Sequence, residues 1–248
     1  MSRRPTPLLL RLLFLASLVP ATALAQDALY LNWDECGPTG PAQRLFACNT
    51  NTGEEHLYCA FTLGQTLDQV LGVELVVDVS HSAASLPPWW QFQSGGCRAG
   101  ALSASSAPPE GTGCTDFWMG SPSGGLQSYV VGQPRGGPNQ ARIRVAFALL
   151  SGNTRTLQAG TLYDAARLVF SNVATTGTGS CSGCGLDACL VLNSMWVRRL
   201  PGAPGGDVFV SAAAPDGGNM ATWQGSGADC AAVPTKPSSW GRIKALYR

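Results

Sequence analysis

Lysine and histidine are scarce in this chain, and it carries little charge of either sign. Its 248 residues include two lysines, Lys236 and Lys244, and two histidines, His56 and His81, and only 12% of the residues are charged. The formal net charge is +1, and no stretch of the sequence forms a basic patch. A nucleic-acid-binding protein needs such a patch to attract phosphates. The composition therefore excludes nucleic acid as a partner.

Residues with the chemistry of hydrolysis are equally sparse. No Gly-x-Ser-x-Gly segment accompanies either histidine, so a serine nucleophile with its base is not indicated. His56 and Cys59 lie three residues apart in a predicted strand, which places their side chains on opposite faces. The acidic residues are few and scattered, so no pair of glycosidase carboxylates can be named. We expect no catalytic residue; the alternative is a secreted, carbohydrate-active hydrolase with an unrecognised acidic site.

Long hydrophobic runs are missing after the first 25 residues. A basic leader with three arginines precedes an apolar stretch over 12–19, and Ala-Leu-Ala at 23–25 fits the small-x-small pattern that signal peptidase cleaves. We therefore expect 1–25 to be a cleaved signal peptide. Nothing later approaches the roughly 18 apolar residues of a membrane span. The mature protein is predicted to be exported to the cell exterior or cell surface, with the periplasm as the alternative.

All nine cysteines follow the leader, and in an oxidising compartment they predict disulfide bonds. Cys59 lies inside an apolar run, so we expect it to be the free thiol. The eight cysteines predicted to be bonded are Cys36, Cys48, Cys97, Cys114, Cys181, Cys184, Cys189 and Cys230. We favour local bonds between Cys36 and Cys48 and between Cys97 and Cys114. The last four then form two bonds whose connectivity stays open.

A metal site is the main alternative for these last four cysteines. The spacing Cys181-x2-Cys184-x4-Cys189, with Cys230, could supply four thiolates to a tetrahedral zinc. Only one Cys-x2-Cys pair is present, and export favours disulfides. We therefore expect no metal and no cofactor, and a Cys-rich metal-binding module is the alternative function. The loop at 216–219 is interpreted as a turn rather than a calcium site.

Alternation of apolar and polar residues is the clearest structural pattern. It is strict over 142–149 and recurs over 72–79 and 162–170, which predicts half-buried strands. Shorter strands are expected at 28–33, 56–62, 89–93, 127–131, 189–199, 207–213 and 219–224, giving about ten in all. Helix periodicity is nearly absent, apart from a possible short C-terminal helix with Trp240, Ile243 and Tyr247 on one side.

Loops rich in Gly, Pro and Ser separate these strands. The main ones are expected at 94–114, 119–126, 132–140, 174–188 and 200–206. Many short strands without intervening helices predict an all-β fold, an antiparallel β-sandwich or jelly roll. We expect one domain over 26–248, in which the Cys-rich segment 177–248 completes the sandwich.

The order of these segments resembles known proteins at two levels. The strand over 72–79, the strand over 142–147 and the segment 160–170 resemble cohesin-like and carbohydrate-binding-module-like sandwiches. Most of the mature chain is similar to a family of uncharacterised secreted bacterial proteins that contain cysteines. The segments that carry this second similarity are 86–92 (Leu-Pro-Pro-Trp-Trp-Gln-Phe), 181–193, 221–225 and 240–248. The resemblance implies export and a β-sandwich, and no particular activity.

Tryptophan is the remaining residue type that could form a binding site, because an exposed indole can stack on a sugar ring or a partner peptide. Seven are present. In a strand, Trp89 and Trp90 would point to opposite faces, so one could meet solvent, and Trp118 is the other candidate. Packing of all three in the core is the competing interpretation. We expect an exported, non-enzymatic binding or structural module whose partner is a polysaccharide or a cell-surface protein.

Overall fold

The computed structural model describes residues 25–106, 113–119, 122–150, 152–225 and 230. The expected leader, apart from Ala25, and the expected C-terminal helix lie outside these residues. The described chain forms strands and two 3-10 turns, η1 (Pro88–Trp90) and η2 (Pro215–Gly217). Within this part of the chain, no helix has the length and apolar character needed to cross a membrane.

The strands assemble into two sheets. In chain order the strands are β1 (Ala28–Trp33), β2 (Gln43–Arg44), β3 (Glu54–Thr62), β4 (Leu67–His81), β5 (Leu102–Ser105), β6 (Pro122–Val131), β7 (Gln140–Leu149), β8 (Arg155–Leu157), β9 (Tyr163–Ser171), β10 (Ala188–Arg199), β11 (Val208–Val210) and β12 (Met220–Trp223). The smaller sheet has the order β1-β3-β9-β5, and the larger has the order β2-β12-β10-β4-β7-β6. β11 and β8 extend the larger sheet by pairing with β10 and β4.

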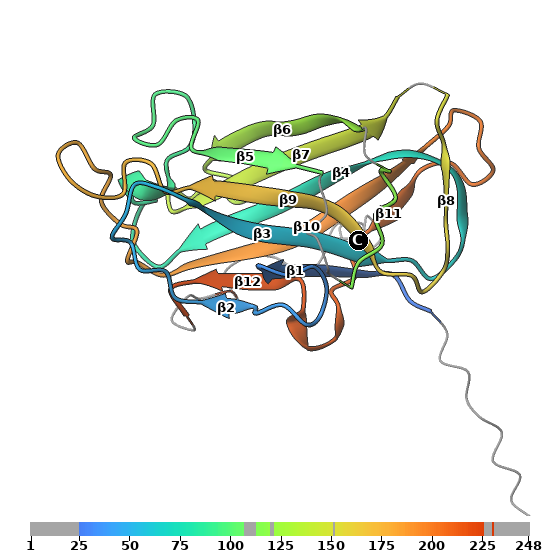
Figure 1. The fold of residues 1–248 in the computed structure, drawn as a ribbon, viewed down its shortest axis with the longest axis horizontal. Helices are drawn as coiled ribbons and strands as arrows, with labels where there is room; N and C mark the ends of the chain where they lie inside the picture. The colour runs from blue at the N-terminus through green and yellow to red at the C-terminus, as the bar shows by residue number, and fades with distance from the viewer. Residues whose placement is uncertain (1–24, 107–112, 120–121, 151, 226–229, 231–248) are drawn as a thin grey trace, which may run out of the picture.

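The two sheets pack face to face, and their strands overlap in Figure 1. Neighbouring strands are antiparallel except for β2 and β12, which are parallel. Alternation decides which side chains point inward: Leu75 of β4 lies opposite Val145 of β7, and both are buried. The fold is therefore the all-β sandwich that the sequence predicts.

Four segments differ from the predicted strands. The segment at 89–93 forms no strand, because Pro87 and Pro88 bring no N–H for a ladder and begin η1 instead. The short strands β2, β5 and β8 have two to four residues and no clear alternation, which explains why the sequence pattern misses them.

In the last quarter of the chain, β10 lies in the interior of the larger sheet, and its inward side chains belong to the main hydrophobic core.

Four disulfide bonds cross-link the chain, and Cys59 is free and buried. The bonds are Cys36–Cys114, Cys48–Cys184, Cys97–Cys181 and Cys189–Cys230. These are the eight cysteines that the sequence predicts to be bonded. Four intramolecular bonds indicate that the chain folds in an oxidising, exported environment.

The predicted local pairings are wrong. Cys36 packs on Tyr58 and Ala60, in a small cluster separate from the main core, whereas Cys48 lies beside Gln224 at the end of β12. Cys97 likewise bonds with a distant cysteine rather than with its sequence neighbour. A disulfide requires Cα atoms within about 7 Å, and the observed bonds have Cα separations of 5.3–5.9 Å. Sheet packing, not proximity in sequence, supplies that closeness.

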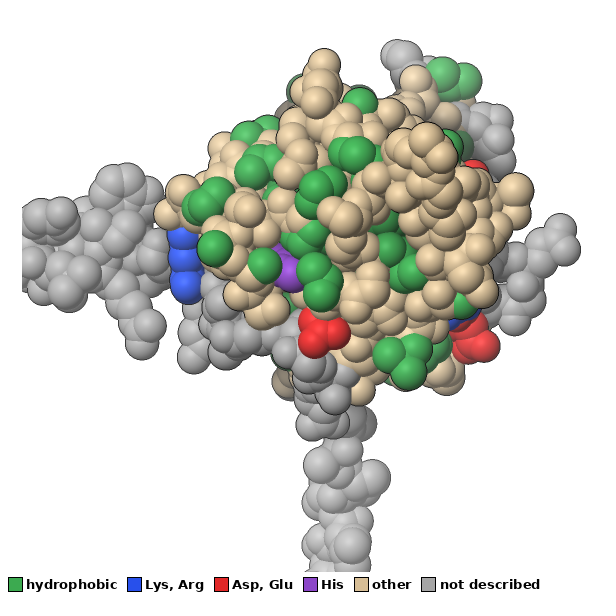
Figure 2. Space-filling view, turned by 90° about the vertical axis from the view of Figure 1, so that its left-hand side faces the viewer, with side chains coloured by type: hydrophobic (Ala, Val, Ile, Leu, Met, Phe, Trp, Pro, Cys, Tyr) green, Lys and Arg blue, Asp and Glu red, His purple; other side chains and the backbone are tan. Residues whose placement is uncertain are grey.

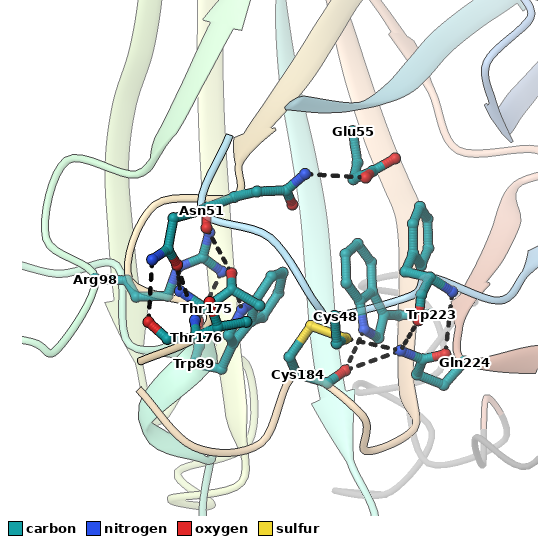
Figure 3. The surroundings of a disulfide bond; sticks show 12 residues. Cys48, Asn51, Glu55, Trp89, Arg98, Thr175, Thr176, Cys184, Trp223 and Gln224 are labelled. Carbon is teal, nitrogen blue, oxygen red and sulfur yellow. Dashed lines mark hydrogen bonds between the residues drawn. A yellow bond between two sulfur atoms is a disulfide. The ribbon is translucent and has the colours of Figure 1, made fainter. Parts of the chain in front are cut away.

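The Cys48–Cys184 bond joins loops at one end of the sandwich (Figure 3). The carbonyl of Cys184 accepts hydrogen bonds from Trp223 Nε1 at 2.6 Å and from Gln224 Nε2 at 3.1 Å. On the neighbouring loop, Asn51 Oδ1 accepts from the backbone N–H groups of Thr175 and Thr176, each at 2.8 Å. These hydrogen bonds and the disulfide connect the loops at this end of the sandwich, in place of strand pairing.

A buried arginine completes this end of the molecule. The guanidinium of Arg98 lies 3.7 Å from the ring centroid of Trp89 and donates to the carbonyls of Trp89, Ser171 and Val173. Because no carboxylate faces it among the described residues, three backbone carbonyls satisfy its donors. Burial lowers the pKa of Arg98 to about 10, so it remains charged at neutral pH.

The outer surface of this loop end carries little charge. Figure 2 shows hydrophobic and uncharged polar groups over most of it, with charged groups near its margin. Leu45, Val173 and Leu186 are exposed there on three different segments. Single exposed apolar side chains are usual on proteins, so they define no binding site.

Candidate functional site

The predicted aromatic platform at Trp89 and Trp90 is wrong, because both indoles lie in the core. Each has a relative exposure of 0%. The two residues belong to η1 rather than to a strand, so their side chains do not alternate between core and solvent. Both indoles pack against Trp223, with ring centroids 4.6 and 5.6 Å away.

Trp118, the third predicted platform residue, is also buried. Its indole lies beside Phe117 and Phe147, with ring centroids 4.0 and 5.9 Å away. The competing interpretation of core packing therefore holds for all three tryptophans.

A different tryptophan, Trp196, faces solvent on the outer face of the larger sheet. Its neighbours in β10, Met195 and Val197, point into the core, so alternation turns Trp196 outward. Trp196 is 38% exposed, and Phe209, opposite it in β11, is 42% exposed. Their ring centroids are 4.9 Å apart. We refer to these two residues as the Trp196–Phe209 pair.

Small residues leave the sheet face hollow beside the Trp196–Phe209 pair. Across the sheet, Trp196 lies opposite Glu74, Glu74 opposite Ala146, and Ala146 opposite Gly125. Ala146 and Gly125 contribute almost no side chain, so the surface dips there. Two adjoining hollows of about 380 and 350 Å³ share part of their lining. We call them together the outer groove; its lining includes Glu74, Gln127, Arg144, Ala146, Ser194 and Trp196.

Arg198 holds the indole of Trp196 from one side. Its guanidinium carbon lies 5.0 Å from the ring centroid. Its Nε and Nη2 donate to the two carboxylate oxygens of Glu74 at 3.0 and 2.7 Å, and Nη1 donates to Asp207 at 2.8 Å. These hydrogen bonds raise the pKa of Arg198, while the backbone N–H of Arg199 and then Arg198 lower the pKa of Asp207. The aromatic pair is therefore braced by a charged network.

Two arginines of β7 share this face and differ in their contacts. Arg142 donates to both oxygens of the buried Asp78 at 2.6 and 2.8 Å, and Asn193 donates to the same carboxylate at 2.7 Å. Arg144 is exposed and lines the outer groove. Its side chain makes no hydrogen bond or ion pair with any residue in the described part of the chain. Its five N–H donors face the groove uncommitted.

A β-bulge in β10 adds polar groups to the outer groove. The register of β10 against β4 shifts between Leu192 and Ser194. The extra residue lets Asn193 reach Asp78 while Ser194 lines the groove. Bulges often re-aim side chains next to functional sites. The groove thereby combines the indole of Trp196 with hydroxyl, amide and guanidinium groups.

Reactive side chains elsewhere are enclosed. Cys59 is fully buried, and burial followed by the charge of Asp164 raises the pKa of its thiol. Asp164 is also fully buried, and burial raises its pKa to about 7. Burial lowers the pKa of His81, against the opposing charge of Asp187. Perturbed pKa values can mark active sites, and here all three groups are buried.

The cysteines of the zinc alternative are occupied by other bonds. Cys181, Cys184 and Cys189 belong to three different disulfides, the last of them with Cys230. Zinc requires thiolates, which a disulfide does not offer. In the segment weighed for calcium, η2 forms a turn and Asn219 is buried. Among the described residues, no group of three or more His, Cys, Asp and Glu side chains is placed to hold a metal ion.

The sequence contains a partial indication of this groove. In β10 the apolar residues of the main hydrophobic core stand at even-numbered positions at Leu190 and Leu192, but at odd-numbered positions at Met195 and Val197. A change of phase within one strand indicates a bulge, and it places Trp196 on the outer face. The sequence does not show that Phe209 and Arg144 flank this tryptophan, because they come from other strands.

Comparison with known protein families, with curated proteins and with solved structures finds no match for this chain.

Proposed function

We propose that this protein is an exported binding module that holds a carbohydrate chain in the outer groove. The observation that carries the proposal is the solvent-facing Trp196–Phe209 pair beside a hollow with polar donors. The apolar face of a sugar ring packs on an indole, while its hydroxyl groups need hydrogen-bond partners. Gln127 and Ser194 offer such partners within the groove lining.

The shape of the groove favours a glycan over a protein partner. A stable protein interface buries about 1,200 Å² or more, with a fully buried apolar centre. Among the described residues of this face, the large exposed aromatic side chains are Trp196 and Phe209, and the adjoining floor carries Glu74 and Ala146. An open, shallow strip of this kind suits an extended chain of small polar rings.

The proposed role is non-enzymatic and lies at the cell exterior, where polysaccharides occur. The carboxylates beside the aromatic pair, Glu74 and Asp207, are both hydrogen-bonded by Arg198. A glycosidase needs one carboxyl as an acid and another as a base or nucleophile. The backbone N–H of Arg199 and the side chain of Arg198 lower the pKa of Asp207, which opposes the protonated form that the acid would need.

The test is Trp196→Ala in a binding assay against a panel of insoluble polysaccharides, followed by calorimetry with soluble fragments of any that bind. Loss of the indole is expected to weaken binding at least about tenfold, because a central aromatic contact commonly contributes more than 1 kcal/mol. Trp196→Phe should retain part of the affinity. Leu186→Ala removes an exposed apolar side chain at the loop end and should have no effect.

Two outcomes contradict the proposal. Equal polysaccharide binding by the wild type and Trp196→Ala would show that the outer groove does not take part in binding. Release of new reducing ends from a bound polysaccharide would instead favour the hydrolase alternative, and Glu74→Gln would then be the variant to compare.

A further inference from the structure

We infer that the outer groove selects an anionic glycan, one whose sugars carry carboxylate or sulfate groups, and that Arg144 binds the anion. This inference rests on the proposed function and names the ligand class of the same groove. It follows from a comparison of the charged side chains on the outer face, some of which have hydrogen-bond partners among the described residues while another has none.

Three carboxylates of this face, those of Glu74, Asp78 and Asp207, accept hydrogen bonds from donors within the fold. Glu74 uses both oxygens on Arg198, and Asp207 accepts from Arg198 and from the backbone N–H of Arg199. Asp78, fully buried, accepts three hydrogen bonds from Arg142 and Asn193. All three acids are therefore paired with an arginine of this face.

The side chain of Arg144, by contrast, is not paired with any described residue. In the described part of the chain its guanidinium has no carboxylate or carbonyl partner, whereas Arg142, two residues away on the same face, is paired with Asp78. A guanidinium binds carboxylate or sulfate through paired, charge-assisted hydrogen bonds. Burying it under a neutral ligand would leave donors unpaired, whereas an anion satisfies them.

The arrangement also predicts how the ligand lies. Trp196 is in β10 and Arg144 is in β7, two strands away, so roughly 10 Å of sheet separates their backbones. Glu74 and Asp207 share one arginine beside the Trp196–Phe209 pair, which disfavours an anion there. The uncharged face of one sugar therefore stacks on Trp196, and the anionic group of a sugar further along the chain reaches Arg144.

The experiment compares acidic oligosaccharides with uncharged forms of the same chains. Oligosaccharides of uronic acid, their methyl esters, sulfated galactans and polyglutamate are titrated calorimetrically into the wild type, Arg144→Gln, Arg135→Gln and Trp196→Ala. Arg135 is exposed in the loop between β6 and β7, outside the outer groove lining, so its variant matches the charge change. Melting curves of all four proteins check that they are folded.

We expect the wild type to bind at least one acidic oligosaccharide about tenfold more tightly than its uncharged form. In Arg144→Gln the affinities for the acidic and uncharged forms should become nearly equal, whereas Arg135→Gln should keep the tenfold difference. Added salt should reduce that difference. Carboxylated and sulfated ligands compared at equal length identify which anion is preferred.

Other results overturn the inference in distinguishable ways. Equal binding of charged and uncharged forms, sensitive to Trp196→Ala and not to Arg144→Gln, overturns the anionic preference and leaves the carbohydrate proposal standing. Binding of polyglutamate as tightly as uronic acid, insensitive to Trp196→Ala, assigns the face to an acidic protein instead. Absence of binding to every glycan overturns both proposals.

Discussion

Asp164 is a carboxyl group whose charged form the fold disfavours. It is fully buried in β9, and its Oδ2 has no hydrogen-bond partner in the described part of the chain. Its Oδ1 lies 3.7 Å from the disulfide sulfur of Cys36, which offers no proton. Burial, and then the charge of Asp116, raise the pKa of Asp164 to about 7, against the opposing charge of Arg167. The folded protein therefore keeps a proton that the unfolded chain loses near pH 4.

This residue should make stability fall as the pH rises. An acid whose pKa is higher in the folded state contributes stability that is fully present below its unfolded pKa. That contribution is lost progressively between about pH 4 and about pH 7, by up to roughly 1.4 kcal/mol per pH unit. Urea unfolding of the wild type and Asp164→Asn at pH 4.5, 5.5, 6.5 and 7.5 measures it. Asp164→Asn should lack this component, and identical pH profiles would contradict the assigned pKa.

At the scale of elements, the outer groove depends on β6 lying close against β7. Gly124 of β6 has a φ of +146°, and a Cβ built there would lie 2.1 Å from the carbonyl oxygen of Ala146. Such an approach is possible only for glycine. The strand therefore reaches the ladder through a residue without a side chain, and next to it Gly125 keeps the floor of the groove low.

Gly124→Ala should separate β6 from β7 locally and destabilise the protein by about 2 to 3 kcal/mol, since strained backbone and a steric clash act together. The measurement is the free energy of unfolding in urea. Gly185→Ala is the matched control, because a Cβ at Gly185 meets nothing within 4 Å. Equal stability of the two variants would show that the backbone at Gly124 relaxes without cost.

The bulge in β10 is the second element that shapes the groove. Without it, the residues after Leu192 would keep their original phase, and Trp196 would enter the core while Met195 faced solvent. One inserted residue therefore decides which side of the sheet carries the aromatic pair.

At the scale of the whole molecule, disulfides tie loops that the sheets alone do not hold. The four bonds span 41 to 136 residues of sequence, and the longest, Cys48–Cys184, connects the loop before β3 to the loop before β10. Closing a long loop restricts the unfolded chain most, so this bond should stabilise the protein strongly.

Replacing both Cys48 and Cys184 by alanine should lower the free energy of unfolding by about 2 to 4 kcal/mol. Denaturant titration measures the change, and thiol alkylation under denaturing conditions should find one free thiol, Cys59, in both proteins. The change should leave glycan binding intact, because the outer groove lies on a different surface. Unaltered stability would show that the surrounding hydrogen bonds suffice to hold the loop.

What the sequence determined by itself was the fold class and the positions of the long strands. Alternation over β4, β7 and β9 is set by the need to bury one face of each strand, so it is visible without any partner. The sequence likewise singled out Cys59 as the free thiol, because an apolar run within a strand buries every second side chain.

Only the tertiary structure decided the disulfide pairing and the location of the candidate site. Cys36 bonds with Cys114 rather than with Cys48, because sheet packing brings distant loops together. Trp89 and Trp90 both enter the core, because prolines convert their expected strand into a turn. The candidate site joins Trp196, Phe209 and Arg144 from three strands. Strand order is a property of long-range pairing that periodicity within one segment does not contain.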